Sequence, residues 1–134
     1  MDLEDLRTFL AHPRHDGWRV PGLEAVRVGD GHLVVRVEVE PGLLNYSGSL
    51  HGGAAATLVD VVGSLAIVAV DRDNRFGVST DLNLTWLAPI PVGEWVEVDA
   101  TVLKCGRTLA FVSVDLRRES DGVLGAQGRM TKKL

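Results

Sequence analysis

The chain has 134 residues, 46% of them hydrophobic, and a formal net charge of −4. This length suits one folded domain with a substantial core, which we expect to span residues 1–134. The cations are scattered apart from the pairs at 117–118 and 132–133, so the sequence excludes a basic stripe for nucleic acid.

The N-terminal residues 2–11 have the spacing of a short amphipathic helix, with apolar side chains at Leu3, Leu6, Phe9 and Leu10. His12-Pro13 then ends this pattern. Acidic side chains stand where a signal peptide carries basic ones, so we expect a cytoplasmic protein. The single cysteine, Cys105, fits that reducing compartment, and it excludes an internal disulfide and a cysteine-rich metal site.

Residues 23–28 and 33–40 flank the turn signal Gly29-Asp30-Gly31, which predicts a β-hairpin. In the second strand one face carries only apolar side chains, at Leu33, Val35, Val37 and Val39. We expect that face to look inward and the other face largely to meet solvent or a partner.

The central stretch, residues 45–70, is a polar loop followed by an apolar segment with a single carboxylate, Asp60. Because the segment has no polar face, we expect a helix that the fold wraps on several sides. Its length approaches that of a membrane span, but Asp60 and Gly63 interrupt it, so a core helix is the better interpretation. A buried carboxylate is costly unless it is paired, which makes Asp60 a site candidate; its alternative is a carboxylate satisfied by Ser64 or Ser79.

Four further strands follow at residues 76–87, 94–103, 108–118 and 123–130, separated by turn signals rich in glycine and proline. Their short connections predict an antiparallel meander. The whole order predicts an α+β fold: a short N-terminal helix and a long central helix wrapped by a curved antiparallel sheet of about six strands. Two such sheets can pair edge to edge or pack face to face, so we expect an oligomer.

Gly52 and Gly53 open the central helix, where free N–H groups and the positive end of the helix dipole suit an oxyanion. His51 and Asn45 lie close by in the sequence, although His51 can instead cap the helix and Asn45 can make a turn. Gly52 and Asp60 are separated by about 12 Å along a helix, so one reacting group can hardly touch both. If both are catalytic, Asp60 must come from a second subunit at a two-fold interface.

The run Leu50-His51-Gly52-Gly53, followed by Thr57-Leu58-Val59-Asp60, resembles the signature of PaaI-like hotdog-fold acyl-CoA thioesterases. Later segments resemble strands of the same family: Val78-Ser79-Thr80-Asp81-Leu82-Asn83, Lys104-Cys105-Gly106-Arg107-Thr108-Leu109-Ala110-Phe111, Ser113-Val114-Asp115-Leu116 and Ala126-Gln127-Gly128-Arg129. The resemblance is co-linear over residues 43–133 and is strongest to the small single-domain members of the thioesterase superfamily.

The resemblance implies a role for each of five residues. Asp60 would act as general base on water or as nucleophile on the thioester carbon, and Ser79 would support it. The Gly52 N–H would polarise the thioester carbonyl, His51 would shape the same pocket, and Asn45 would hold the water. In the family the Asn, His and Gly come from one subunit and the acid and Ser from its neighbour. Many relatives carry Glu at the acid position, so the shorter Asp leaves direct attack and water activation both open.

The resemblance also places the substrate. Coenzyme A would lie along the outer surface near Asp81, Lys104, Arg107 and Lys133, whose alternative role is that of solvated surface charges. Gly53 would contact the substrate, and an acyl channel would be lined by Trp86, Trp95 and Phe111, each of which can instead be a packing residue. The family implies neither a metal nor a further cofactor.

We therefore expect a thioesterase that hydrolyses acyl-CoA to a free acid and coenzyme A, with a homodimer as its minimal unit and a homotetramer as its assembly. One alternative is a hotdog hydratase or dehydratase, although a His-Gly-Gly sequence at the helix start fits thioesterases better. Another is a module that binds acyl-CoA without cleaving it, against which Asp60 and Asn45 argue. The acyl preference is not fixed by the sequence.

Overall fold

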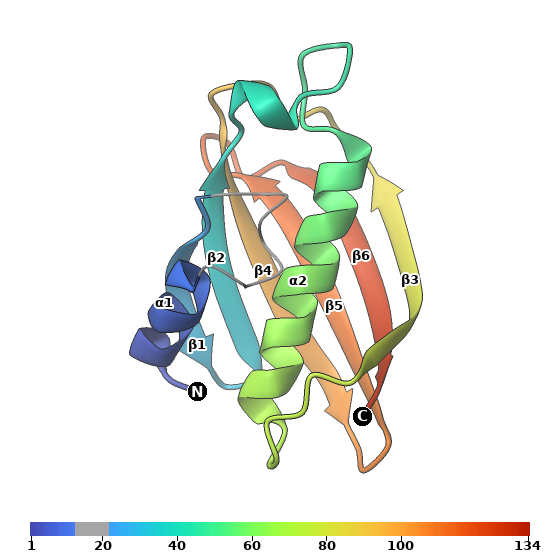
Figure 1. The fold of residues 1–134 in the computed structure, drawn as a ribbon. Coiled ribbons are helices and arrows are strands. Elements are labelled where there is room, and N and C mark those ends of the chain that lie inside the picture. The colour runs from blue at the N-terminus through green and yellow to red at the C-terminus, as the bar shows by residue number, and fades with distance from the viewer. Residues whose placement is uncertain (13–21) are drawn as a thin grey trace.

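The computed structural model describes residues 1–12 and 22–134 (Figure 1). Helix α1 (Leu3–Ala11) precedes the hairpin of β1 (Glu24–Gly29) and β2 (His32–Glu38). The 3-10 helix η2 (Pro41–Leu43) leads to the long helix α2 (Gly52–Val70). Four strands complete the chain: β3 (Val78–Trp86), β4 (Trp95–Cys105), β5 (Leu109–Arg118) and β6 (Leu124–Lys133). The predicted α+β order of elements is confirmed.

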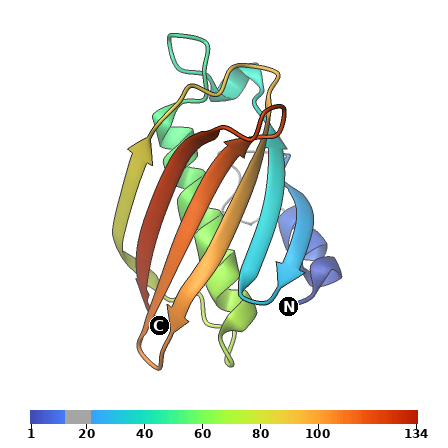
Figure 2. The same cartoon turned by 180° about the vertical axis from the view of Figure 1, so that it is seen from behind.

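The six strands form one antiparallel sheet in the order β1-β2-β4-β5-β6-β3. The predicted meander is confirmed for β4, β5 and β6 and is wrong for β3, which pairs with β6 at the far edge of the sheet, while β2 occupies the place beside β4. Residues 87–94 carry the chain from one strand to the other, and β1 and β3 lie at opposite edges in the view from behind (Figure 2). A short connection therefore does not by itself determine which strands pair.

The core lies between α2 and one face of the sheet (Figure 1). The inward positions of β2 alternate as predicted, and Leu33, Val35 and Val37 are at most 1% exposed. On β4 and β5 the same alternation buries a row of small and branched side chains completely, at Val96, Val98, Ala100, Val112, Val114 and Leu116. On the other face of β2, Val34 is also buried, at 3% exposure.

Helix α2 is covered on all sides in its C-terminal half, where residues 61–68 are all buried, but its N-terminal half is open on the side away from the sheet. Gly53 and Asp60 are exposed and Thr57 is half-buried; these three residues follow one another at helical spacing on the side away from the sheet. Among the described helices α2 alone is long and apolar enough to cross a membrane. Because 61% of this apolar stretch is buried in the protein, α2 is a core helix. The expected burial of Asp60 is therefore wrong for the single chain, because only one face of the N-terminal half of α2 is covered.

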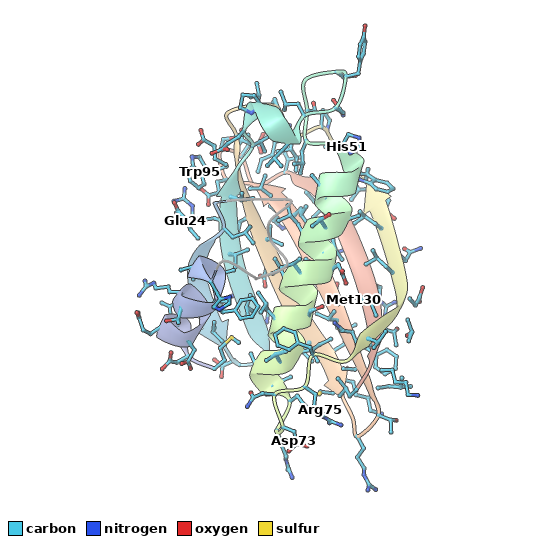
Figure 3. The ribbon with its side chains drawn as sticks, in the orientation of Figure 1. Glu24, His51, Asp73, Arg75, Trp95 and Met130 are labelled. Atoms are coloured by element: carbon cyan, nitrogen blue, oxygen red, sulfur yellow. The ribbon has the colours of Figure 1, made fainter. Side chains whose placement is uncertain are left out.

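Two glycines let α2 approach the sheet closely at the turn that carries Asp60. A Cβ atom on Gly128 would lie 2.8 Å from Val59 Cγ1, and one on Gly63 would lie 3.0 Å from Met130 Cε. Met130 lies beside the C-terminal half of α2 (Figure 3). Helix and sheet are thus in contact at these positions with no room for a side chain.

We expect Gly128→Ala to lower the free energy of unfolding by about 1–3 kcal/mol, because the added methyl overpacks the contact with Val59. Gly42→Ala is the matched control, since its added Cβ has no neighbour within 4 Å. Urea unfolding of both variants measures the difference. Equal stability of the two variants would contradict the close packing.

Candidate active site

The first group of candidate residues lies where α2 begins (Figure 3). His51 is the N-cap residue, and its Nδ1 accepts a hydrogen bond from the Gly53 N–H at 2.9 Å. The capping alternative for His51 is therefore confirmed, and in this arrangement its ring proton sits on Nε2. The Gly53 N–H is engaged, whereas among the described residues no group accepts from the Gly52 N–H. Gly52 thus offers the open donor at the positive end of the helix.

Asn45 lies in the loop before α2. It makes a turn there, which was the alternative to a catalytic role. Its Oδ1 accepts from the Ser47 N–H at 2.9 Å and from the Ser49 N–H at 3.1 Å. The amide oxygen is therefore used within the loop, and the Nδ2 group is the part of Asn45 left to donate to a ligand or water. A cavity of about 540 Å³ is lined by Asn45, Gly52 and Trp86 together.

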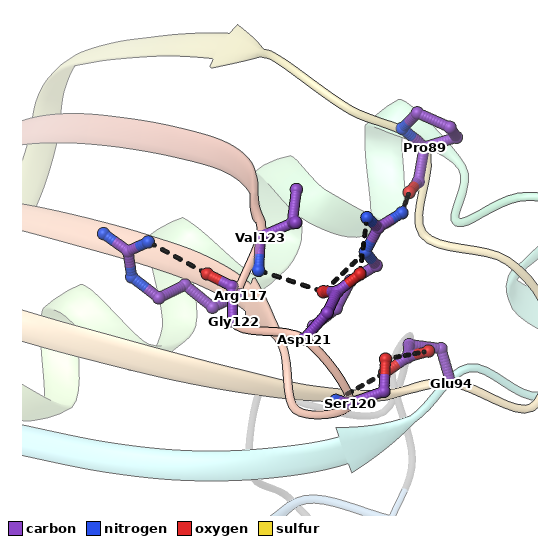
Figure 4. A network of polar contacts seen from close by, with 8 residues as sticks. Pro89, Glu94, Arg117, Ser120, Asp121, Gly122 and Val123 are labelled. Carbon is purple, nitrogen blue, oxygen red and sulfur yellow. Dashed lines mark hydrogen bonds and ion pairs between the residues drawn. The ribbon is translucent and has the colours of Figure 1, made fainter.

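The far wall of this cavity includes Pro89 and Ile90, from the segment that joins β3 to β4. Arg118 fixes that segment by donating to the Pro89 carbonyl at 3.1 Å and to the Asp121 carboxylate at 2.8 Å (Figure 4). Beside it, Ser120 donates to the Glu94 carboxylate at 3.0 Å. The polar network therefore ties the cavity wall to the turn between β5 and β6.

The second group of candidate residues lies two turns further along α2. Ser79 Oγ of β3 donates to Asp60 Oδ1 at 2.8 Å, so a hydroxyl holds the carboxylate as the sequence suggested. Ser64, the other hydroxyl considered, donates instead to the backbone carbonyl of Asp60 at 2.6 Å. A separate cavity of about 330 Å³ is lined by Asp60, Ser64 and Ser79, with Lys132 and Phe76.

Within one chain, the structure does not bring the two groups together. The open Gly52 N–H and the Asp60 carboxylate face different cavities, about 12 Å apart along the axis of α2. A thioester carbonyl on Gly52 would therefore be out of reach of Asp60 in the same chain.

The charged residues expected to bind coenzyme A are spread over the surface. Arg107 lines a cavity of about 850 Å³ at the C-terminal end of α2, and Asp81 lines another on the outer side of the sheet. Lys104 and Lys133 are exposed, each at the end of a strand. Of the proposed acyl-channel residues, Trp86 lies beside Gly52, whereas the outer face of the sheet carries Trp95, which stacks on Arg36 at 4.0 Å, and Phe111.

Sequence reasoning missed Lys132, which it noted only as one of two neighbouring cations. Its side chain is 5% exposed, and Nζ donates to Ser64 Oγ at 2.7 Å. The signal that could have found it is the alternation of β6, in which Gly128, Met130 and Lys132 share the face that meets α2.

An ion pair between Asp71 and Arg75 lies just after the C-terminal end of α2. Asp71 is 7% exposed. Arg75 donates to it from its backbone N–H, from Nε and from Nη2, and these bonds hold the pKa of Asp71 well below its usual range. Cys105 Sγ lies 3.9 Å from Asp71 Oδ1. Burial raises the pKa of the Cys105 thiol, and the Asp71 carboxylate raises it further.

We therefore expect Cys105 to react with a disulfide reagent at pH 7.5 at least about tenfold more slowly than glutathione, because the thiolate is the reactive form. The same protein unfolded in urea is the control and should react at the rate of a free thiol. A folded protein that reacts as fast as glutathione would contradict this placement of the thiol.

Among the described residues, no group of three or more His, Cys, Asp or Glu side chains could hold a metal ion. Residues 47–124 match the Thioesterase superfamily. Mouse acyl-coenzyme A thioesterase 13 is 40% identical over 124 residues, covering 87% of this chain and 88% of that protein. The crystal structure of zebrafish thioesterase superfamily member 2 covers 100% of this chain and 99% of its own, with 38% identity and a TM-score of 0.91.

A hypothetical thioesterase from Streptococcus pneumoniae, crystallised with coenzyme A, has 25% identity and a TM-score of 0.76 over 84% of each chain. The sequence resemblance to small thioesterases is thus confirmed, and so is the predicted hotdog fold. The chain belongs to the thioesterase superfamily.

Proposed function

We propose that this protein hydrolyses acyl-CoA thioesters to a free acid and coenzyme A. One observation carries the proposal: the open Gly52 N–H at the start of α2 and a Ser79-held Asp60 carboxylate lie on the same helix. An oxyanion donor and a base are the two groups that acyl transfer to water requires. The named activity of the mouse relative supports the same assignment.

In the proposed reaction, the thioester oxygen accepts from the Gly52 N–H, which stabilises the negative charge that develops on it. Asp60 then acts by one of two routes. As a base it takes a proton from water, the water oxygen bonds to the carbonyl carbon, and the C–S bond breaks. As a nucleophile its carboxylate attacks the carbon, and water hydrolyses the resulting anhydride. In both routes the departing thiolate takes up a proton, and the amide of Asn45 donates to the attacking water or to the carbonyl.

We propose that Asp60 of one subunit serves the Gly52 of another, in a homodimer that is the smallest active unit. The edge strand β3 supports this arrangement, since Val78, Leu82 and Trp86 are 68%, 41% and 58% exposed there. An edge strand is a template for pairing with a second chain. Pairing β3 with its copy would continue the sheet and lay the open sides of both α2 helices together. Two such dimers would form the expected homotetramer.

Coenzyme A would bind along the exposed surface, with its phosphates near Lys104, Arg107 and Lys133 and with Asp81 beside them. These cations lie on exposed strand ends or line an open cavity, where a long cofactor can reach them. That the Streptococcus pneumoniae relative was crystallised with coenzyme A supports coenzyme A as the group to be bound. We propose a cytoplasmic enzyme, which the lone Cys105 supports, and one that needs no metal.

Free thiol release from short, long and aromatic acyl-CoAs tests the proposed function. We expect release from at least one class of acyl group, with no need for added metal. Tight binding of every acyl-CoA without release would instead favour the binding module. Loss of an enoyl-CoA double bond without thiol release would favour the hydratase.

A further inference from the structure

Lys132 is a buried cation that the proposed chemistry does not use. Among the described residues the buried charged side chains are Asp71 and Lys132. Lys132 is 5% exposed and lines the same cavity as Asp60. Burying a lysine costs more than burying an apolar residue of its size, so its presence here needs a reason.

A chain of hydrogen bonds connects Lys132 to the turn of α2 that carries Asp60. Lys132 Nζ donates to Ser64 Oγ at 2.7 Å, and Ser64 Oγ donates to the Asp60 carbonyl at 2.6 Å. A charged donor makes a short and directional hydrogen bond, and it polarises the hydroxyl so that the next bond in the chain is strengthened. Strand β6 is thereby linked to the backbone of Asp60.

A second connection runs through the sheet. Ser79 of β3 and Lys132 of β6 are direct partners in the antiparallel ladder. Both side chains line the cavity of Asp60, and Ser79 Oγ donates to the Asp60 carboxylate at 2.8 Å. Lys132 is therefore adjacent to both groups that orient Asp60, one at its backbone and one at its side chain.

The apolar contacts at this turn fix the distance between α2 and the sheet. Val59 against Gly128 sets how closely α2 approaches the sheet at this turn. The bond from Lys132 to Ser64 is directional, so together with the bond from Ser64 to the Asp60 carbonyl it adds a polar restraint to the turn that carries the Asp60 side chain. A base must be held close to its productive geometry, which gives the buried charge a function.

We propose that Lys132 is a positioning residue for the Asp60 carboxylate and acts through Ser64. This inference rests on the proposed function, in which Asp60 is the reacting group. Lys132 itself does not touch the thioester. Its loss would leave substrate binding intact and weaken the chemical step.

The test compares Lys132→Met, which removes the charge at similar size, with Ser64→Ala, which removes the link and keeps the lysine. We expect each to lower kcat by about 10-fold to 100-fold, the range for supporting residues, with KM changed less than about threefold. The double variant should be no slower than either single variant, because both break one connection. Arg27→Met removes an exposed cation from β1 and is the control for net charge.

All rates are normalised to the fraction of protein that binds a non-hydrolysable acyl-CoA analogue, so a loss of folded protein does not count as a loss of kcat. If Lys132→Met does not fold, Ser64→Ala carries the test alone. A kcat within threefold of wild type in Ser64→Ala, or a double variant with the product of both losses, would overturn the inference. An Asp60→Ala variant that keeps full activity would instead overturn the proposed function, so the two failures are distinguishable.

Discussion

Replacing Asp60 by alanine is expected to lower kcat for acyl-CoA hydrolysis by about two to four orders of magnitude, the contribution of a general base or more. The carboxylate is exposed on α2 and held by Ser79, so its loss removes the reacting group without removing a core side chain. KM should change little, because Asp60 is not assigned to binding coenzyme A. Thiol release at saturating substrate measures the effect.

Two further variants make this prediction specific. Asp60→Asn keeps the size of the side chain and can still accept from Ser79, yet it should be nearly as slow as the alanine variant. Asp73→Ala removes an exposed carboxylate beyond the C-terminal end of α2 (Figure 3) and should keep wild-type activity. Asp60→Ala with more than a tenth of wild-type kcat would exclude Asp60 as base or nucleophile.

A single turnover in oxygen-18 water can establish direct attack by Asp60. If Asp60 attacks the carbon and water then opens the anhydride at the Asp60 carboxyl, the first acid released carries no label and the label enters Asp60. A labelled first acid is the result expected when Asp60 activates water, and it also arises when water opens the anhydride at the acyl carbon.

We expect Gly52→Pro to lower kcat by a factor of about 10²–10³, because it removes one oxyanion donor. This is the second large effect. Proline is tolerated at the first position of a helix, which Gly52 occupies, and it lacks only the N–H that the reaction needs. His51 has φ −61° and ψ 137°, the extended conformation that a residue before proline prefers. The helix should therefore form in the variant.

Gly52→Ala is the matched control, since it keeps the N–H and places the same Cβ about 3.2 Å from the indole nitrogen of Trp86. We expect the alanine variant to lose far less activity than the proline variant, and circular dichroism to show the same helix content in both. Equal activity of the two variants would mean that the Gly52 N–H does not polarise the carbonyl.

The sequence predicted most secondary structure because the signals were local. Alternation in β2, for example, follows from one face meeting the core, and Leu33, Val35 and Val37 are buried as expected. The pairing of β3 with β6 was not predictable in the same way, because it depends on which edge is free after β2 has paired with β4. Sequence order carries little information on that competition.

The identity of the candidate site residues was predictable from the sequence. Their burial, and the neighbours that contact them, were less predictable. Asp60 was expected to be buried because its neighbours in the sequence are small or apolar, yet the fold leaves one side of the N-terminal half of α2 open. That open side is what a second subunit would cover. Lys132 was missed for the opposite reason: a lysine beside another lysine at a strand end suggests solvent, and only the register of β6 places it inward.

Activity of a mixed dimer tests the shared site most directly. A purified heterodimer of one Asp60→Ala subunit and one Gly52→Pro subunit contains one site with both groups intact, provided that each site takes Asp60 and Gly52 from different chains. We predict about half of the wild-type activity per dimer, although either variant alone is nearly inactive. If Asp60 and Gly52 act within one chain, every site in the heterodimer lacks a group. An activity no higher than that of the parent variants would therefore contradict the shared site.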